Sequence, residues 1–172
     1  MGLAVQVGLR LRELRVSRGL SLSELARRSG VGKGTLSELE GGRRNPTLET
    51  LYALTTELGV PLSSALAGPA APVGISGDAV DAVLTDRYED ADAVTETYRI
   101  RVRAAAVQHS PGHTRGTTEH VVVLSGTVLV GDPAAPVRVP AGGHTRWAAD
   151  VPHVYQAPDG DAEAVLVVRY PR

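Results

Sequence analysis

Two short amphipathic segments separated by a glycine constrain the fold of this chain more than any other feature. Residues 21–29 read SLSELARRS, residues 33–40 read KGTLSELE, and Gly30 lies between them. Ser21 followed by Glu24 is a helix-capping pattern, and glycine adopts the positive φ of a tight turn without steric cost. Ala26 offers a small side chain where two helices would cross. The pattern therefore predicts two short helices joined by a tight turn.

The apolar residues of these segments recur at helical spacing, so one side of the helix pair can be buried. We expect Leu25, Val31, Leu36 and Leu39 to face inward. The outer face of the second helix then carries Lys33, Gly34, Ser37 and Glu38.

Helical patterns also flank the pair. Residues 9–19 place Leu11 and Leu14 on one face and end in a glycine. Residues 48–58 repeat leucine at helical spacing after Thr47, a candidate cap, and residues 60–67 suit a last short turn. Residues 1–67 therefore predict an all-α domain of five helices.

The character of the sequence changes after residue 67. Residues 68–77, GPAAPVGISG, are uncharged and rich in proline, glycine and alanine, which predicts a linker. Residues 78–172 contain short alternating or apolar runs, such as TETYRIRV, EHVVVLSGTVLVG and AEAVLVVRY, separated by glycine and proline. Such runs predict an all-β sandwich or barrel. The chain is thus expected to be a multidomain α + β protein.

Charge differs between the two parts. Residues 1–68 hold nine Arg or Lys and six Asp or Glu, a net +3, whereas residues 69–172 hold nine and thirteen, a net −4. A polyanionic partner would therefore bind the first part. The chain has no cysteine, which excludes disulfides and thiolate metal sites and fits a reducing compartment. It shows no signal pattern and no apolar run near the roughly 20 residues of a membrane span, so we expect a cytoplasmic protein without a membrane partner.

The spacing of residues 21–40, followed by EGGRRNPTLETL, resembles the XRE family of helix-turn-helix domains, which includes Cro and the phage repressors, over about residues 7–66. The resemblance implies that residues 33–40 form a recognition helix in the major groove of an operator. Lys33 would then donate to guanine and Glu38 accept from cytosine, while Gly34 lets the backbone approach. The alternative is a solvated Lys33 that touches only phosphate. The predicted DNA-binding residues are Ser21, Gly32, Lys33, Gly34, Thr35, Ser37, Glu38, Arg43, Arg44 and Asn45.

Residues outside the recognition helix are expected to contact phosphates. Residues 43–45 follow it directly, and the Ser21 hydroxyl lies at the start of the preceding helix. The alternative for the two arginines is a solvated turn. The resemblance also implies a structural ion pair between Arg15 and Glu40.

Two glycines weaken the recognition helix. Gly32 stands where the family often has a serine or threonine, so it offers no side-chain cap, and Gly34 costs about 1 kcal/mol relative to alanine. We expect this helix to be loose in the free protein and to tighten on DNA.

Residues 111–131 and 140–158 resemble the two cupin motifs, which implies a cupin barrel (a double-stranded β-helix) over residues 78–172. His113, Glu119 and Gly126 occupy family positions in the first motif, and Gly142 and His153 occupy them in the second.

The cupin resemblance implies a metal site with one ligand replaced. His113, Glu119 and His153 can form a facial triad for iron, manganese, nickel or zinc. Arg115 stands where the second histidine is expected, and arginine cannot bind a metal. An inward Arg115 would favour an anionic effector, whereas an outward Arg115 leaves a weak metal site. The predicted ligand pocket comprises His113, Arg115, Glu119, Arg146, Trp147, His153 and Tyr155.

The other histidines carry less information. His120 directly follows Glu119 on a predicted strand and should face away from it. His109 is either a strand-end residue or a substitute for the missing ligand, and His144 has no evident partner.

The order of the two domains predicts a transcriptional regulator, a repressor or a dual regulator. We expect a homodimer, joined through the cupin domain, on a palindromic double-stranded operator, with the cupin sensing a small-molecule effector. No catalytic residue is predicted. One alternative is a metal-dependent cupin enzyme, a dioxygenase or isomerase, fused to a DNA-binding module. Another is an empty barrel that serves only to dimerise.

Overall fold

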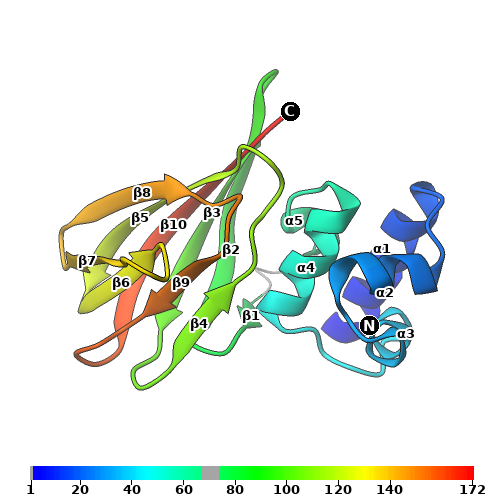
Figure 1. The fold of residues 1–172 in the computed structure, drawn as a ribbon, viewed down its shortest axis with the longest axis horizontal. Helices are drawn as coiled ribbons and strands as arrows, with labels where there is room; N and C mark the ends of the chain where they lie inside the picture. Colours follow the sequence, from blue (N-terminus) through cyan, green and yellow to red (C-terminus); the bar gives the residue numbers. More distant parts are fainter. Residues whose placement is uncertain (1, 67–73) are drawn as a thin grey trace. The chain divides into compact units, whose positions relative to one another are not determined.

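The computed structural model describes residues 2–66 and 74–172, which divide into two compact units within Met1–Val73 and Gly74–Arg172 (Figure 1). The first unit is helical and the second is built from strands. Of the predicted linker, residues 68–73 lie outside the described residues. Gly74–Ser76 are not linker but a short strand, because they pair in register with residues 81–83. Within the described ranges, no helix combines the length and apolar character needed to span a membrane.

The helical unit confirms the prediction of an all-α domain. Its described residues form α1 (Leu3–Ser17), α2 (Leu22–Ser29), α3 (Lys33–Glu40), α4 (Leu48–Leu58) and α5 (Ser63–Leu66). Leucine builds its core, since the chain has no phenylalanine. The leucines with at most 1% exposure are Leu11, Leu25, Leu36, Leu39, Leu51, Leu54, Leu58 and Leu62.

Local signals set the ends of α2 and α3. The Ser21 hydroxyl accepts a hydrogen bond from the Glu24 N–H at 3.1 Å, so α2 is capped as predicted. Gly30 ends α2 with φ at 70°, a left-handed conformation that glycine adopts without penalty. Gly32 precedes α3 and gives it no side-chain cap. The first turn of α3 therefore lacks a side-chain acceptor for its N–H groups.

Contact between α1 and α3 positions the second helix of the pair. A Cβ atom on Gly8 of α1 would lie 2.1 Å from the carbonyl oxygen of Leu39, so only glycine permits this approach. Further along, the Arg15 guanidinium donates two hydrogen bonds to the Glu40 carboxylate, at 2.6 and 2.7 Å. It donates a third to the Leu20 carbonyl, at 2.9 Å. The predicted Arg15–Glu40 ion pair is thus present, and it ties α1 to the end of α3.

The β-rich unit consists of two antiparallel sheets that face each other, an arrangement consistent with a cupin fold (Figure 1). The larger sheet has the order β1-β2-β3-β10-β5-β8 and the smaller sheet the order β4-β9-β6-β7. The strands are β1 (Gly74–Ser76), β2 (Val80–Glu89), β3 (Ala93–Val102), β4 (Val107–Ser110), β5 (Thr118–Ser125), β6 (Thr127–Gly131), β7 (Val137–Pro140), β8 (His144–Ala148), β9 (His153–Gln156) and β10 (Ala162–Pro171).

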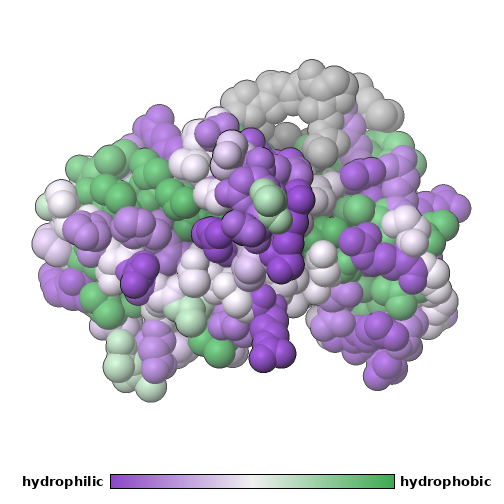
Figure 2. Space-filling view, turned by 90° about the horizontal axis from the view of Figure 1, so that it is seen from above, coloured by the Kyte–Doolittle hydropathy of each residue, from purple (hydrophilic) through white to green (hydrophobic). Residues whose placement is uncertain are grey.

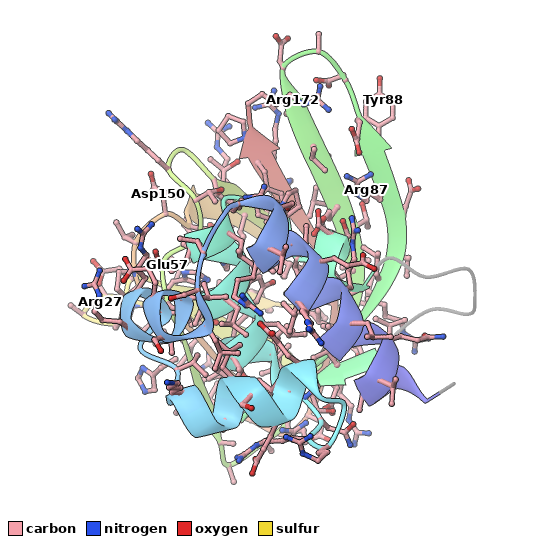
Figure 3. All side chains as sticks on the ribbon, turned by 90° about the vertical axis from the view of Figure 1, so that its right-hand side faces the viewer. Arg27, Glu57, Arg87, Tyr88, Asp150 and Arg172 are labelled. Carbon is pink, nitrogen blue, oxygen red and sulfur yellow. The ribbon has the colours of Figure 1, made fainter. Side chains whose placement is uncertain are left out.

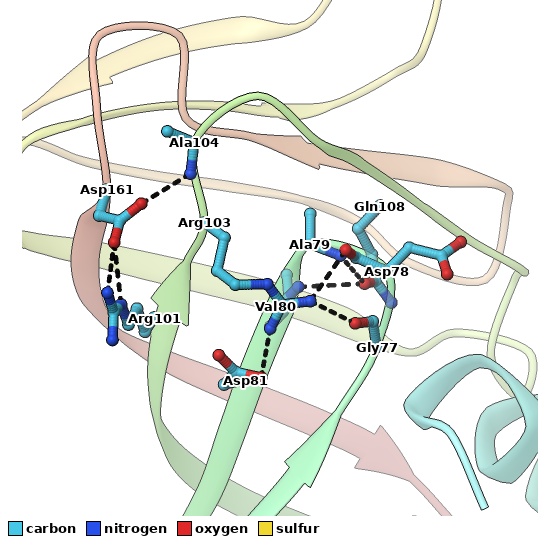
Figure 4. A network of polar contacts seen from close by, with 10 residues as sticks. All are labelled: Gly77, Asp78, Ala79, Val80, Asp81, Arg101, Arg103, Ala104, Gln108 and Asp161. Carbon is cyan, nitrogen blue, oxygen red and sulfur yellow. Dashed lines mark hydrogen bonds and ion pairs between the residues drawn. The ribbon is translucent and has the colours of Figure 1, made fainter.

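Polar contacts join the segments between these strands (Figure 4). The buried Gln108 side-chain oxygen accepts hydrogen bonds from the N–H groups of Ala79, at 3.1 Å, and Val80, at 3.2 Å. The Asp161 carboxylate accepts from the Ala104 N–H at 2.8 Å and pairs with an arginine of β3. These contacts hold the start of β2 against β4, and the end of β3 against the start of β10.

The C-terminus is held against the β2–β3 hairpin. The Arg172 guanidinium donates to Glu89 at 2.7 Å, and its backbone N–H donates to the Asp92 carbonyl at 2.9 Å. Figure 3 shows Arg172 beside Arg87 and Tyr88 near this hairpin. Arg87 forms an ion pair with Glu89 on the same strand, and the contacts of Arg172 tie the end of β10 to the β2–β3 hairpin.

The close approach at Gly8 gives a prediction about stability. Gly8→Ala would place a methyl group against rigid backbone, and we expect it to lower the free energy of unfolding of the helical unit by roughly 2 kcal/mol. Gly34→Ala is the matched control, because Gly34 is also helical but has no atom within 4 Å of a Cβ. It should raise stability by up to about 1 kcal/mol. Urea unfolding followed by circular dichroism measures both changes, and equal effects of the two substitutions would contradict the close α1–α3 packing.

Candidate functional site

The outer face of α3 is the first candidate site. Leu36 and Leu39 are buried, whereas Lys33, Ser37 and Glu38 are exposed on the same short helix. Of the ten residues predicted to bind DNA, nine are exposed and Thr35 is half-buried. The structure therefore leaves nine of these ten residues accessible to a partner.

The segment after α3 folds back onto the end of that helix. The Arg43 N–H donates to the Glu38 carbonyl at 2.9 Å, and Gly42 makes the turn with φ at 66°. The Arg44 guanidinium lies 3.5 Å from the Glu38 carboxylate in an exposed ion pair. A contact of Glu38 with cytosine would therefore compete with Arg44.

An open hollow of about 280 Å³ lies between α1, the start of α2 and the end of α3. Arg12 and Arg43 line it together with the Arg15–Glu40 pair and Ser37. Arg12 is exposed and does not appear among the predicted residues. The sequence pattern of α2 and α3 could not reveal it, because its position depends on how α1 packs against α3.

A buried cluster in the β-rich unit is the second candidate site. His113 follows β4, Glu119 lies on β5 and His153 begins β9, and each side chain is 1% exposed. The Nε2 atom of His113 lies 2.9 Å from Oε1 of Glu119, and Nε2 of His153 lies 3.3 Å from Oε2. One ligand atom from each of the three residues lies within 4.8 Å of the others. The structure thus brings together the three predicted metal ligands.

Aromatic side chains surround this cluster. The Tyr155 hydroxyl donates a hydrogen bond to Oε2 of Glu119. The Trp147 ring lies 5.8 Å from that of Tyr155 and 6.2 Å from that of His153, measured between centroids. Tyr170 of β10, which neither motif includes, has its ring centroid 6.3 Å from that of His113. The alternating pattern of the last strand is the signal in the sequence that could have identified Tyr170.

Two predicted pocket residues lie elsewhere. Arg115 is exposed in the turn between β4 and β5, so it does not fill the place of the missing histidine. Arg146 is also exposed and pairs in register with His120, whereas its neighbour Trp147 pairs with Glu119. Because successive residues of a strand point to opposite faces, Arg146 lies on the outer face of the sheet. The predictions that Arg115 and Arg146 line the pocket are therefore corrected.

The remaining histidines are exposed. His120 faces away from Glu119 as expected, and it packs edge-on against His144 at 5.6 Å on the outer face. His109 is exposed on β4, so it does not replace the missing ligand.

Charge within the cluster sets the protonation of its members. Burial by itself raises the pKa of Glu119, but the charge of His153 and hydrogen bonds from both histidines outweigh it and hold this pKa well below the ordinary value of 4.5. Burial likewise lowers the pKa of His153, but the Glu119 carboxylate outweighs it and raises the pKa above 6.5. The cluster thus favours an ionised carboxylate beside a protonated imidazole.

The same residues fit a divalent metal ion. Two imidazole nitrogens and one carboxylate oxygen form a ligand set used by iron and related transition metals. They converge within a buried space, and a metal would displace the proton that the Glu119 carboxylate favours on His153. Metal binding and protonation of the cluster should therefore compete.

Comparison with known proteins identifies the chain. The helix-turn-helix (HTH_3) family matches residues 11–64. The HTH-type transcriptional regulator SutR from Escherichia coli (strain K12) is 33% identical over 168 residues, which cover 94% of this chain and 93% of SutR. The chain belongs to the helix-turn-helix family of transcriptional regulators. This confirms the predicted class, a DNA-binding regulator.

A solved structure extends the family likeness over both units. An HTH_3 family transcriptional regulator from Vibrio cholerae has a TM-score of 0.88 and 28% identity, covering 99% of this chain and 98% of that chain. The Cupin_2 domain of an XRE family regulator from Enterobacter cloacae is 26% identical with a TM-score of 0.43, covering 45% of this chain and 83% of that chain.

The charge pair in the cluster predicts how stability depends on pH. The raised pKa of His153 stabilises the folded unit below pH 6.5, and this contribution is lost as pH rises through the raised value. The lowered pKa of Glu119 stabilises it above pH 4.5, and this contribution is lost as pH falls through the lowered value. We therefore expect the metal-free unit to be most stable between pH 4.5 and 6.5.

Urea unfolding in the presence of a chelator, followed by the fluorescence of Trp147, the chain's one tryptophan, measures this dependence. The control His120→Gln should keep this pH dependence, whereas His153→Gln should remove the fall in the free energy of unfolding above pH 6.5. A wild-type free energy of unfolding that increases above pH 6.5 would contradict the assigned charge pair.

Proposed function

We propose that this regulator binds a palindromic operator as a homodimer, with α3 in the major groove of each half-site. The observation that carries the proposal is the exposed polar face of α3, held in place by the buried contact with α1. An α-helix with its side chains is about 10–12 Å across, which suits a major groove about 12 Å wide. Family membership supports DNA as the partner.

Within this arrangement, we assign different roles to different side chains. Lys33, at the start of α3, reads base edges, since residues at the N-terminal end of a recognition helix point into the groove. Ser21 and residues 43–45 hold phosphates on either side. Phosphate contacts fix the register of the helix, and base contacts select the sequence.

A dimer is proposed because one helix pair makes too few contacts for useful specificity. The outer face of β5 exposes Val122 and Leu124, at 37% and 54%, on a strand whose other face is buried. Figure 2 shows hydrophobic patches on the visible surface of the β-rich unit. Burial of such residues between two copies would supply a contact for dimerisation.

The β-rich unit is proposed to sense a small molecule at the buried cluster. His113, Glu119 and His153 would hold a divalent ion, which supplies a Lewis-acid site for an oxygen-bearing effector. The rings of Trp147 and Tyr155 would form walls of the effector site. An anionic effector would then bind through the metal, since Arg115 is exposed. Effector binding would alter the spacing of the two DNA-binding units.

The buried ligand set also favours a second candidate, a metal-dependent cupin enzyme joined to a DNA-binding domain. Known dioxygenase sites use two histidines and one carboxylate with open positions. Turnover of an oxygen-bearing substrate by metal-loaded protein would support the enzyme. A metal or effector that changes operator affinity without turnover would support the sensor.

The role of Lys33 predicts a change in sequence preference. Lys33→Ala should reduce the ratio of operator affinity to random-duplex affinity about tenfold, because one good base contact is worth about 1–3 kcal/mol of discrimination. Arg18→Ala, at the exposed end of α1, is the control and should leave the ratio unchanged. Fluorescence anisotropy with an operator selected from random duplexes measures both. Equal losses of affinity for the operator and for random duplex would indicate that Lys33 contacts a phosphate instead.

The ligand set predicts metal binding that depends on Glu119. Chelator-treated wild-type protein should gain about 2.7 kcal/mol of stability when manganese or zinc is present at a hundred times its dissociation constant. Glu119→Gln should lose this gain, whereas His120→Gln should keep it. Thermal unfolding followed by Trp147 fluorescence measures the effect. Equal stabilisation of all three proteins would contradict the site.

A further inference from the structure

The hollow between α1, α2 and α3 has the chemistry of an anion site. Three guanidiniums, those of Arg12, Arg15 and Arg43, line it against one carboxylate, that of Glu40. The side chains at its wall therefore leave a formal charge of +2. Its volume of about 280 Å³ admits a phosphate group with several waters, since one water takes about 30 Å³.

The charge of two of these arginines is available to a ligand. Arg15 donates two hydrogen bonds to Glu40 and one to the Leu20 carbonyl, so its guanidinium is engaged and it neutralises the carboxylate. Among residues 2–66 and 74–172, Arg12 and Arg43 form no ion pair. Both are exposed and line the hollow from different elements, one on α1 and one after α3.

Gly41 gives the Arg43 guanidinium its position. A Cβ atom on residue 41 would lie 2.6 Å from Nη1 of Arg43, so the guanidinium folds over the bare backbone at the end of α3. Arg43 thus lies on the wall of the hollow.

We propose that Arg12 and Arg43 clamp one backbone phosphate of the operator, with the Ser37 hydroxyl as a third donor. The inference rests on the proposed function of α3 and adds Arg12 to its DNA contacts. Guanidinium groups match phosphate geometry with parallel N–H donors, and a charge-assisted hydrogen bond of this kind is stronger than a neutral one.

Ser37 connects the hollow with the proposed DNA-binding face of α3. It lies one helical turn after Lys33, so both share the exposed face of α3. When Lys33 meets base edges, Ser37 and the hollow lie toward the wall of the groove, where the phosphates run. A phosphate held there fixes how deep and at what angle α3 enters.

The test measures how duplex affinity depends on salt. Loss of one phosphate contact should lower the slope of log affinity against log salt by about 0.9. Arg12→Ala should show this change, weaken operator and random duplexes by the same factor, and leave the sequence preference intact. Arg43→Ala should show the same pattern. Arg18→Ala removes the same charge outside the hollow and should leave the slope at the wild-type value.

Arg12→Lys keeps the charge and should restore most of the slope, which separates a lost phosphate contact from misfolding. Circular dichroism of each variant checks that the helices are formed. If the wild-type protein binds duplex DNA and Arg12→Ala matches Arg18→Ala, the clamp is overturned while the proposed function stands. If the wild-type protein binds no duplex, the proposed function itself fails.

Inorganic phosphate provides a second arm that distinguishes a small free anion from DNA. Competition between inorganic phosphate and duplex for the wild-type protein, lost in Arg12→Ala, supports the clamp. Stabilisation by inorganic phosphate with an unchanged salt slope in Arg12→Ala overturns it, because the hollow would then bind a free anion away from the DNA.

Discussion

The ion pair between Arg15 and Glu40 is the interaction on which the DNA-binding unit depends. Both side chains are largely buried, at 12% and 6% exposure, and two short hydrogen bonds join them. Removing one partner of such a pair costs about 3–5 kcal/mol, because the other charge is left buried and unpaired. The pair joins α1 to the end of α3, and its third hydrogen bond holds the α1–α2 turn. Without the ion pair, α3 would lose the orientation that presents Lys33.

The same contact explains why the hollow beside it carries positive charge. Arg15 neutralises Glu40, so Arg12 and Arg43 act on whatever approaches from outside. The sequence predicted the helices, their caps and the ion pair, because these follow from local patterns and from the resemblance to phage repressors. It did not predict the role of Gly8 or of Arg12. Both depend on the distance between α1 and α3, which is set by packing between segments about 30 residues apart.

In the β-rich unit, the sequence predicted the buried cluster but not all of its surroundings. Motif spacing located His113, Glu119 and His153, and the register of β5 with β8 brings Trp147 to the same face. Arg115 is predicted in the pocket because it stands where the second histidine of the first motif is expected, and Arg146 because it neighbours Trp147 in the chain. The alternation of side chains along β8 sends Arg146 outward, and the turn before β5 exposes Arg115. Residues that are adjacent in the sequence, such as Arg146 and Trp147, can therefore lie on opposite faces of a barrel.

Amide exchange of the full chain, with and without duplex from its own promoter, tests the central claim that α3 enters DNA. The helix lacks a side-chain cap and carries a glycine in its first turn, so its free N–H groups should exchange rapidly. The account predicts that duplex slows exchange in residues 33–38 and 43–45, while α4, on the other side of the core, changes little. Equal exchange of residues 33–38 in the two samples, at a duplex concentration that saturates binding, would contradict it.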